Sequence, residues 1–260
     1  MRTSELVDDL GETVPVEGTV SRVVSLVPSL TEAVEVSAPG RLAGVTDYCT
    51  HPSTLDVPRV GGSKYPKLDR VLDLAPDLVL ANAEENRPED VERLRANGIP
   101  VWVMAAAASV PAALGSLRRI LTQAFELAEP EWLVAAEEIW RDAGPVRFHA
   151  VVPVWRKPWI VLGRDTFAGD VLRRVGVANV YATAEERYPR PDVEELRAHL
   201  SADADLLVLP DEPYLFTEED GPDHFPDAPY VLVSGRHLTW YGPSLVEAHA
   251  ALTASIPSGP

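Results

Sequence analysis

Residues 109–143 read SVPAALGSLRRILTQAFELAEPEWLVAAEEIWRDA, and they lie where a two-lobed protein would ordinarily carry a flexible linker. The first part of this stretch has the i, i+3, i+7, i+10 spacing of one apolar helix face: Leu114, Leu117, Leu121 and Ala124. Pro130 suits the first position of a second helix, where its missing N–H costs nothing. The sequence therefore predicts a stiff helical connection, although a packed helical hairpin inside one domain explains the pattern equally well.

The overall composition excludes some functions. The chain has 260 residues with 40 acidic and 23 basic side chains, and its formal net charge of -17 disfavours a nucleic-acid binder, which needs a basic face. Its single cysteine, Cys49, excludes an internal disulfide and a multi-cysteine zinc site. We therefore expect a soluble protein with room for two small hydrophobic cores.

The first residues bear on the compartment. Residues 1–9 contain no apolar h-region, no small-residue cleavage site and no lipid-accepting cysteine. No apolar run approaches the roughly 20 residues of a membrane span. As written, the sequence predicts a cytoplasmic protein, and a periplasmic or cell-surface one if the N-terminus was trimmed.

The order of predicted elements repeats. The first half alternates strands with helices, which is typical of a parallel sheet; the strands are expected at residues 22–27, 42–46, 76–81 and 99–103, and the helices at 68–74 and 87–97. After a strand pair at 148–155 and 159–163, a short helix (192–200), a strand (204–209), an acidic loop and another strand (228–233) follow in the same order as residues 68–103. Two copies argue for two similar lobes. We predict an N-terminal lobe at 1–108, a helical bridge at 109–144 and a C-terminal lobe at 145–260.

Several loops carry chemistry. Ser29 follows the first strand and is expected to cap a helix, with Glu32 as its capping-box partner, at an edge where α/β sheets often bind ligands. Asp47, Cys49 and His51 lie within five residues and could bind a metal, but a fourth ligand and a matching motif are missing, which favours a solvent-facing turn with a buried cysteine. Aromatic residues also gather at predicted loops and strand ends: Tyr48, Tyr65, Trp155, Tyr188, Trp240 and Tyr241. A flat hydrophobic ligand would explain these rings, and core packing is the alternative.

A family resemblance rests on five segments in order: Arg22-Val-Val-Ser-Leu-Val-Pro-Ser-Leu-Thr-Glu, Val60-Gly-Gly, Leu74-Ala-Pro-Asp-Leu-Val-Leu-Ala, Gly98-Ile-Pro-Val and Trp240-Tyr-Gly-Pro-Ser. Together they resemble the cobalamin-, haem- and ferric-siderophore-binding proteins of ABC importers, over most of the chain. The resemblance implies an α/β fold of two similar three-layer lobes with parallel-type sheets, bridged by a long central helix. It further implies a metal chelate bound between the lobes, an ABC permease as partner and a monomeric protein.

The resemblance also implies site residues. The ligand contacts would be Ser29, Thr31, Asp47, Tyr48, Tyr65, Glu84, Glu85, Asn86, Trp155, Tyr188, Trp240 and Tyr241. An acid on each lobe would contact the permease, at Asp69 and at Glu194 or Glu195. Cys49, His51 and, on the other lobe, His237 are candidate axial ligands to the metal of the chelate.

Two alternatives stay open at this point. A chelatase-like or chelate-modifying enzyme could use Cys49, His51, His149 and His237, although the sequence shows no catalytic triad, phosphate loop or His-Glu-x-x-His element. Direct binding of free zinc or manganese would require three or four converging ligands. A member that stays in the cytosol could handle a metal chelate after import.

Overall fold

The computed structural model describes residues 6–202 and 204–257, which form two compact units. Unit 1 comprises the chain up to Ala106, residues 114–134 and residues 241–243. Unit 2 comprises residues 107–113, residues 135–240 and the chain from Ser244 onward. The segment predicted as a separate bridge is therefore shared between the units, and a three-residue segment of the C-terminal half belongs to unit 1.

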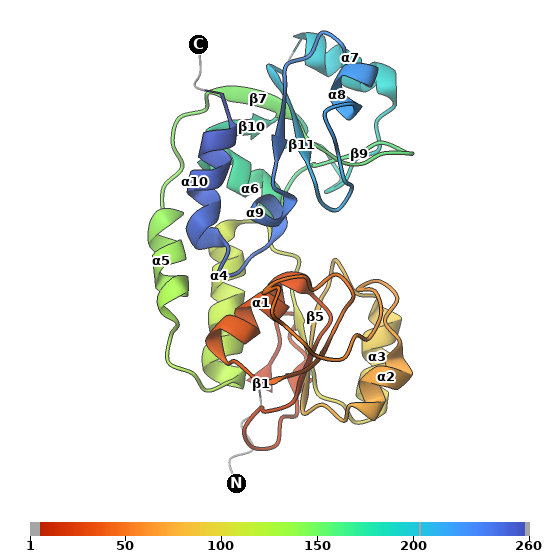
Figure 1. Ribbon diagram of the computed structural model, residues 1–260, viewed down its shortest axis with the longest axis vertical. Helices are drawn as coiled ribbons and strands as arrows, with labels where there is room; N and C mark the ends of the chain where they lie inside the picture. Colours follow the sequence, from red (N-terminus) through yellow and green to blue (C-terminus); the bar gives the residue numbers. More distant parts are fainter. Residues whose placement is uncertain (1–5, 203, 258–260) are drawn as a thin grey trace. The chain divides into compact units, whose positions relative to one another are not determined.

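Unit 1 is built on a four-stranded parallel sheet with the strand order β4-β3-β5-β6. The strands are β3 (Val23–Ser25), β4 (Leu42–Val45), β5 (Leu78–Asn82) and β6 (Val101–Met104). The helices are α1 (Pro28–Ser37), α2 (Leu68–Asp73) and α3 (Pro88–Ala96). α2 and α3 cover one face of the sheet, and α1 lies on the opposite face with the unit 1 part of α4 (Val110–Arg119) (Figure 1).

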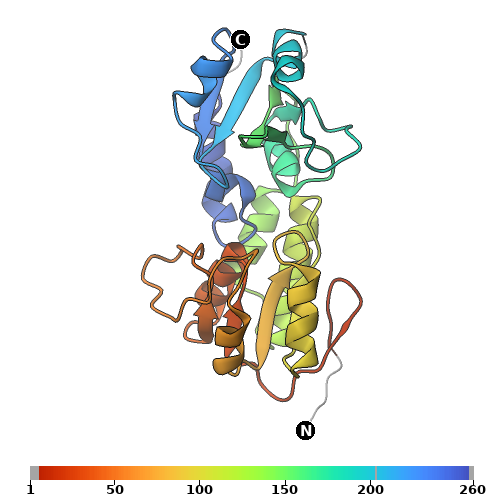
Figure 2. The same ribbon diagram turned by 90° about the vertical axis from the view of Figure 1, so that its right-hand side faces the viewer.

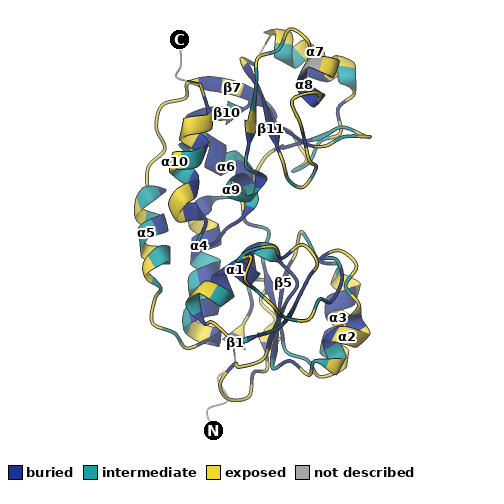
Figure 3. Cartoon of the chain, viewed as in Figure 1, coloured by how far each residue is buried: buried dark blue, intermediate teal, exposed yellow. Residues whose placement is uncertain are grey.

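Burial on both faces explains the sequence of these strands. All residues of β5 and β6 are buried, so the strands read as continuous apolar runs rather than as alternating ones. One face packs Val24, Val79 and Val103 against Val71 of α2 and Leu94 of α3. The outward faces of α2 and α3 are exposed in Figure 3, as expected for helices with a single apolar stripe.

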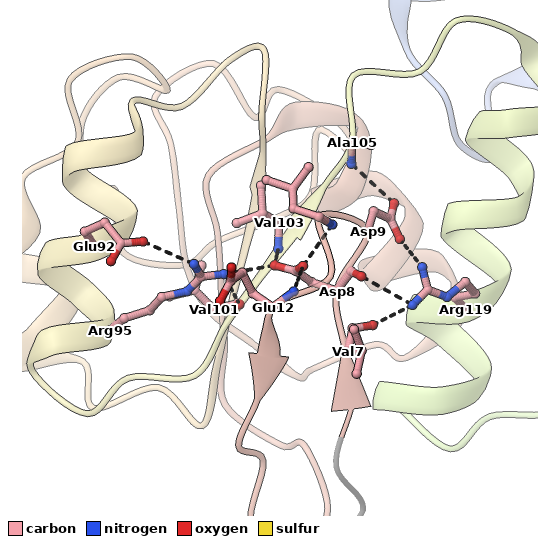
Figure 4. A network of polar contacts seen from close by, with 11 residues as sticks. Val7, Asp8, Asp9, Glu12, Glu92, Arg95, Val101, Val103, Ala105 and Arg119 are labelled. Carbon is pink, nitrogen blue, oxygen red and sulfur yellow. Dashed lines mark hydrogen bonds and ion pairs between the residues drawn. The ribbon is translucent and has the colours of Figure 1, made fainter.

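An N-terminal hairpin is joined to the edge of this sheet by buried carboxylates. β1 (Leu6–Val7) and β2 (Thr13–Val14) pair antiparallel. The Asp8 side chain, which is 0% exposed, accepts hydrogen bonds from the backbone N–H of Val103 (3.2 Å) and from Arg95 (2.9 Å). Asp9 forms an ion pair with Arg119 of α4 (Figure 4). The two acids therefore hold the hairpin turn against both β6 and α4.

Unit 2 repeats the plan with the strand order β10-β7-β11-β12, again parallel throughout. The strands are β7 (Phe148–Val151), β10 (Val177–Asn179), β11 (Leu206–Pro210) and β12 (Tyr230–Val233). A two-stranded antiparallel ribbon follows β7, formed by β8 (Pro153–Trp155) and β9 (Ile160–Val161). The predicted strand pair is thus divided, since β7 joins the main sheet and β8 joins the ribbon.

Helices cover both faces of the unit 2 sheet (Figure 2). They are α6 (Phe167–Arg174), α7 (Val193–Ala202), α8 (Asp220–His224), α9 (Gly235–Thr239) and α10 (Leu245–Ser255). Leu196 of α7 packs with Val151, Leu207 and Leu209 of the sheet. Thr166 caps α6, since its side chain accepts a hydrogen bond from the N–H of Gly169.

The middle of the chain is helical, as predicted. α4 continues into a π-helical turn, Ile120–Ala124, and α5 spans Glu131–Ile139 directly after Pro130. Each end of α5 carries a tryptophan with a hydrogen bond inside its own unit. Trp132 Nε1 donates to Ser37 Oγ in unit 1 (2.9 Å), and Trp140 Nε1 donates to the Leu245 carbonyl in unit 2 (2.8 Å).

The two sheets share one strand order, in which the second strand of each unit flanks the first and the third strand lies on its other side. The predicted fold class, two similar α/β lobes with parallel sheets connected through central helices, is confirmed. Among the described residues, no helix is long and apolar enough to cross a membrane.

Candidate functional site

The strand order defines a candidate ligand position in each unit. In unit 1 the chain leaves β3 toward β4 on one side and then returns to β5 on the other side. The loops that follow β3 and β5 therefore run in opposite directions from the carboxyl ends of these strands, the position where open α/β sheets often bind ligands. Residues 82–86, which follow β5, lie at this place, as does the start of α1.

Two asparagines fix the loop after β5. The backbone N–H of Asn82 donates to Asn86 Oδ1 (2.8 Å), and Asn82 Oδ1 accepts from the N–H of Glu84 (2.7 Å). Asn86 Nδ2 donates to the Ser63 carbonyl (2.8 Å), which ties this loop to the neighbouring one. Both asparagines are buried, so their amides are used to shape the loop that carries Glu84 and Glu85.

Tyr241 completes the unit 1 site from a distant part of the chain. Its hydroxyl accepts a hydrogen bond from Asn82 Nδ2 (2.8 Å), donates to Glu85 Oε1 (3.4 Å) and contacts the side chain of Ser29. Gly242 permits this approach, because a Cβ there would lie 3.2 Å from the Ser29 carbonyl oxygen. The structure thus brings together three predicted site residues, Ser29, Glu85 and Tyr241.

Electrostatics distinguish Glu85 within this cluster. Burial raises the pKa of Glu85 to about 7, the nearby charge of Glu84 raises it further, and the hydrogen bond from Tyr241 counteracts both. Burial and the Glu85 charge in turn raise the pKa of Tyr241 well above its ordinary value. A strongly raised pKa of this kind at the carboxyl edge of a sheet is typical of functional groups.

A long loop, residues 46–66, carries two exposed tyrosines beside this cluster. Tyr48 is 65% exposed and Tyr65 is 67% exposed. The Arg87 guanidinium lies 4.8 Å from the centroid of the Tyr65 ring. Arg59 fixes the first part of the loop by donating to the carbonyls of Thr46 (3.0 Å) and Cys49 (2.8 Å). Both rings are thus exposed on an ordered loop, and Arg87 covers one face of the Tyr65 ring.

The candidate metal ligands do not converge. Cys49 is fully buried, and its sulfur contacts the hydroxyls of Thr31 (3.0 Å) and Thr46 (3.1 Å). Burial raises the pKa of the Cys49 thiol, although these hydroxyls counteract it. His51 Nδ1 contacts the neighbouring Thr50 hydroxyl. Within the described part of the chain, no three His, Cys, Asp or Glu side chains form a group that could hold a metal ion.

Burial also defines the roles of Thr31 and Asp47. Thr31 is fully buried, and its hydroxyl donates to the Val27 carbonyl (3.0 Å) besides contacting Cys49, which indicates a supporting rather than a contacting role. Asp47 is exposed next to Tyr48. Ser29 does not cap α1 as predicted, because the helix begins one residue earlier, at Pro28, and Val27 takes the N-cap position.

Unit 2 presents aromatic rings at the corresponding edge of its own sheet. Trp155, which ends β8, is 43% exposed, and its ring meets Tyr214 edge-on with 5.6 Å between centroids. Tyr214 lies on the loop after β11 and packs against Phe216. Leu215, between them, is strongly exposed. Because β7 and β11 are the first and third strands of this sheet, these side chains lie at its own switch point.

An ion pair fixes this aromatic loop. Arg156, directly after Trp155, pairs with the buried Asp220 at the start of α8. Asp220 also accepts hydrogen bonds from the backbone and side chain of Thr217. Although burial opposes the effect, these hydrogen bonds and the arginine lower the pKa of Asp220. The pair therefore holds the loop that carries Tyr214 against the ribbon that carries Trp155.

The remaining unit 2 candidates have other partners. Trp240, expected as an exposed ring, is buried, and its Nε1 donates to Glu212 (3.0 Å). Tyr241 is buried as well, because its hydroxyl is used inside unit 1. His237 contacts Glu247 of α10 (3.2 Å), and Tyr188 is half-buried on the loop between β10 and α7.

The predicted docking acids lie on helices α2 and α7. Asp69 of α2 is exposed and pairs with Arg93 of α3 (2.9 Å). Glu194 of α7 is exposed and pairs with Arg197 (2.7 Å), whereas Glu195 accepts a hydrogen bond from the Tyr181 hydroxyl (3.1 Å). Glu194 is therefore the better surface candidate in unit 2.

Sequence reasoning missed several residues of both edges: Asn82, Arg59, Arg156, Tyr214 and Asp220. Asn82 had a usable signal, since a polar residue that ends a fully apolar strand lies at the carboxyl edge of a sheet. The sequence signal for Tyr214 was weaker, and consisted only of its position just after the acidic loop that follows β11. Arg59 and Arg156 contact residues that lie at least 10 positions away in the sequence, so no local pattern predicted these contacts.

Comparison with known proteins places this fold in a class. The chain has the fold of the class III periplasmic binding proteins. It matches the haem-binding protein RhuT of Roseiflexus sp. RS-1 with a TM-score of 0.72 at 21% identity, over 92% of this chain and 98% of that one. It matches the periplasmic vitamin B12-binding protein BtuF of Vibrio cholerae with a TM-score of 0.70 at 18% identity, over 91% and 96%.

At the level of particular proteins, the sequence is similar to a vitamin B12-binding protein of Vibrio parahaemolyticus, with 24% identity over 191 residues. That match covers 68% of this chain and 67% of the relative. No protein-family model matches the chain. The resemblance to cobalamin- and haem-binding proteins predicted from the five sequence segments is thus confirmed, and these relatives are binding proteins rather than enzymes.

The prediction of a cytoplasmic protein is wrong. The relatives of known structure named above are periplasmic proteins. The prediction rested on the absence of an export signal in residues 1–9, of which the first five lie outside the described residues. The matches to periplasmic proteins extend over more than nine-tenths of the chain.

Proposed function

We propose that this chain is a non-catalytic periplasmic substrate-binding protein for a metal chelate, for uptake by an ABC importer. The observation that carries the proposal is that each unit presents exposed aromatic rings on loops that follow the strands of its own parallel sheet. Tyr48 and Tyr65 do so in unit 1 and Trp155 does so in unit 2. Flat rings on ordered loops suit a large ligand with a planar, largely apolar face.

The similar proteins support the chemical class of the ligand. Those named above are a haem-binding protein and two vitamin B12-binding proteins, and both ligands are metal chelates of a planar macrocycle. Because the described residues offer no group of His, Cys and acidic ligands for a bare ion, we propose that the metal arrives already chelated. An ABC permease would then contact Asp69 and Glu194, which are exposed on helices α2 and α7.

Titration of the purified protein tests this function. We expect binding, seen as a shift of the visible absorption spectrum and as heat in calorimetry, with at least one of cyanocobalamin, ferric haem and a ferric hydroxamate. Replacing Tyr65 by Ala should weaken that binding about tenfold, since a stacked aromatic ring contributes roughly 1–2 kcal/mol at such sites.

Leu10→Ala is the matched control, because Leu10 is an exposed apolar residue of the hairpin β1–β2 turn. It should leave the affinity unchanged. If the wild-type protein binds none of the three ligands, the proposed function is contradicted.

A further inference from the structure

The polar groups of the unit 1 site have an uneven balance of donors and acceptors. The amide donors of Asn82 and Asn86 are given to Tyr241 and to Ser63, and the Tyr241 hydroxyl donates to Glu85. The protein therefore uses these amide and hydroxyl donors to build the site, and the half-buried Glu85 presents carboxylate oxygens beside them.

Carboxylates dominate the immediate surroundings of Glu85, and Glu84 is the charge that acts on it. Glu84 and Glu85 lie on the loop after β5, and the buried Glu32 of α1 lies close to Gly242, with an oxygen 3.7 Å from where a Cβ of Gly242 would be. The cation of this loop, Arg87, pairs with Glu89 (3.3 Å) and Asp90 (2.8 Å). Lys64 is exposed on the neighbouring loop. A ligand carboxylate at the Glu85 position would meet repulsion rather than an ion pair.

We propose that Glu85 is a specificity-determining residue, which accepts hydrogen bonds from neutral amide groups on the periphery of the chelate and disfavours chelates that carry carboxylates there. This inference rests on the proposed function and names its ligand class. Cyanocobalamin has peripheral amides, whereas haem has two carboxylates. The structure therefore assigns the amide-bearing class.

The proton of Glu85 makes the selectivity depend on pH. With a pKa of about 7, the side chain is largely ionised at pH 8 and largely neutral at pH 6. The groups that face it are Glu84 on its own loop, Tyr241 from the returning segment, Ser29 of α1 and Asn82 of β5. Of these, Glu84 raises the pKa of Glu85 and the hydrogen bond from Tyr241 lowers it.

A matched pair of ligands tests the inference without a change of metal or ring. Cyanocobalamin and its monocarboxylate, in which one peripheral amide is hydrolysed, are titrated against wild type, Glu85→Gln and the control Glu92→Gln at pH 6 and pH 8. Glu92 is an exposed acid of α3. Thermal unfolding of each variant confirms that it is folded.

For wild type at pH 8 we expect the amide form to bind at least tenfold more tightly than the carboxylate, with the ratio falling severalfold at pH 6. In Glu85→Gln, the ratio of the affinity for cyanocobalamin to that for the monocarboxylate should be small at both pH values. Glu92→Gln should match wild type. An equal ratio in wild type and Glu85→Gln would overturn the inference, as would tighter binding of haem than of cyanocobalamin at pH 8. Neither result would contradict the proposed function, which fails if no chelate binds.

Discussion

The burial of Glu85 has a consequence for stability as well as for binding. Its pKa of about 7 in the folded protein exceeds the ordinary value of 4.5. A group with a raised pKa contributes stability that is fully present below the unfolded value and is lost as pH rises through the folded value. Wild type should therefore lose stability between about pH 4.5 and pH 7 through this one group.

Glu85→Gln removes that loss because glutamine does not ionise. We expect its melting temperature to exceed that of wild type by about 2–4 °C at pH 8, as roughly 1 kcal/mol produces in a chain of this size. At pH 4.5 the advantage should vanish. Melting curves of both proteins across this range measure it, and a constant difference at all pH values would show that the titrating group lies elsewhere.

Whether a contact in the site can be predicted from the sequence depends on how far apart its two partners lie along the chain. The family resemblance predicted both Glu85 and Tyr241 as site residues. It did not predict the hydrogen bond between them, because 156 residues separate them. Ser29 was expected to cap a helix from its local pattern, and the structure uses it for a contact with Tyr241 instead. Local rules predict local partners, and this site is built from long-range ones.

At the scale of elements, the N-terminal hairpin depends on one buried carboxylate. Asp8 accepts hydrogen bonds from the backbone N–H groups of Leu10, Glu12 and Val103 and pairs with Arg95. Asp8→Ala leaves these donors without their acceptor in a buried place. We expect a loss of about 3–5 kcal/mol in the free energy of unfolding, which is typical when one partner of a buried pair is removed.

Urea unfolding monitored by tryptophan fluorescence measures this loss. Glu12→Ala is the control, because Glu12 is exposed and only its backbone N–H, which alanine retains, donates to Asp8. We expect its free energy of unfolding to change by no more than about 0.5 kcal/mol. Equal stability of the two variants would mean that the Asp8 network shown in Figure 4 contributes little.

Most elements were predictable because their patterns are local. The buried strands β5 and β6 read as apolar runs, and α3 ends at the expected Gly98, whose φ of 77° suits glycine. The short elements β10, α8 and α9 were missed. β10 has three residues and α8 and α9 have five each, too few for a periodic signal to be separated from a loop.

At the scale of the whole molecule, the repeat was predictable and the path of the chain was not. Both units have the same strand order, which follows from the same succession of strands and helices. However, residues 241–243 leave unit 2 to complete unit 1, and 107–113 of the first half belong to unit 2. No Gly/Ser-rich or charged linker marks these points in the sequence, so the crossings of the chain between the units gave no signal.

The net charge of -17 leads to a final prediction about ligand capture. A strongly negative protein repels anionic ligands over distances that salt screens, and a neutral ligand is unaffected. If the ligand carries amides rather than carboxylates, capture should be insensitive to salt.

Stopped-flow association rates of cyanocobalamin are therefore expected to stay within about twofold between 20 and 300 mM NaCl. The rate for its monocarboxylate should rise with salt, by about two- to threefold, because the repulsion is screened. Parallel salt dependences for the two ligands would show that the charge of the protein does not act on the approaching ligand, and that any selectivity arises after contact.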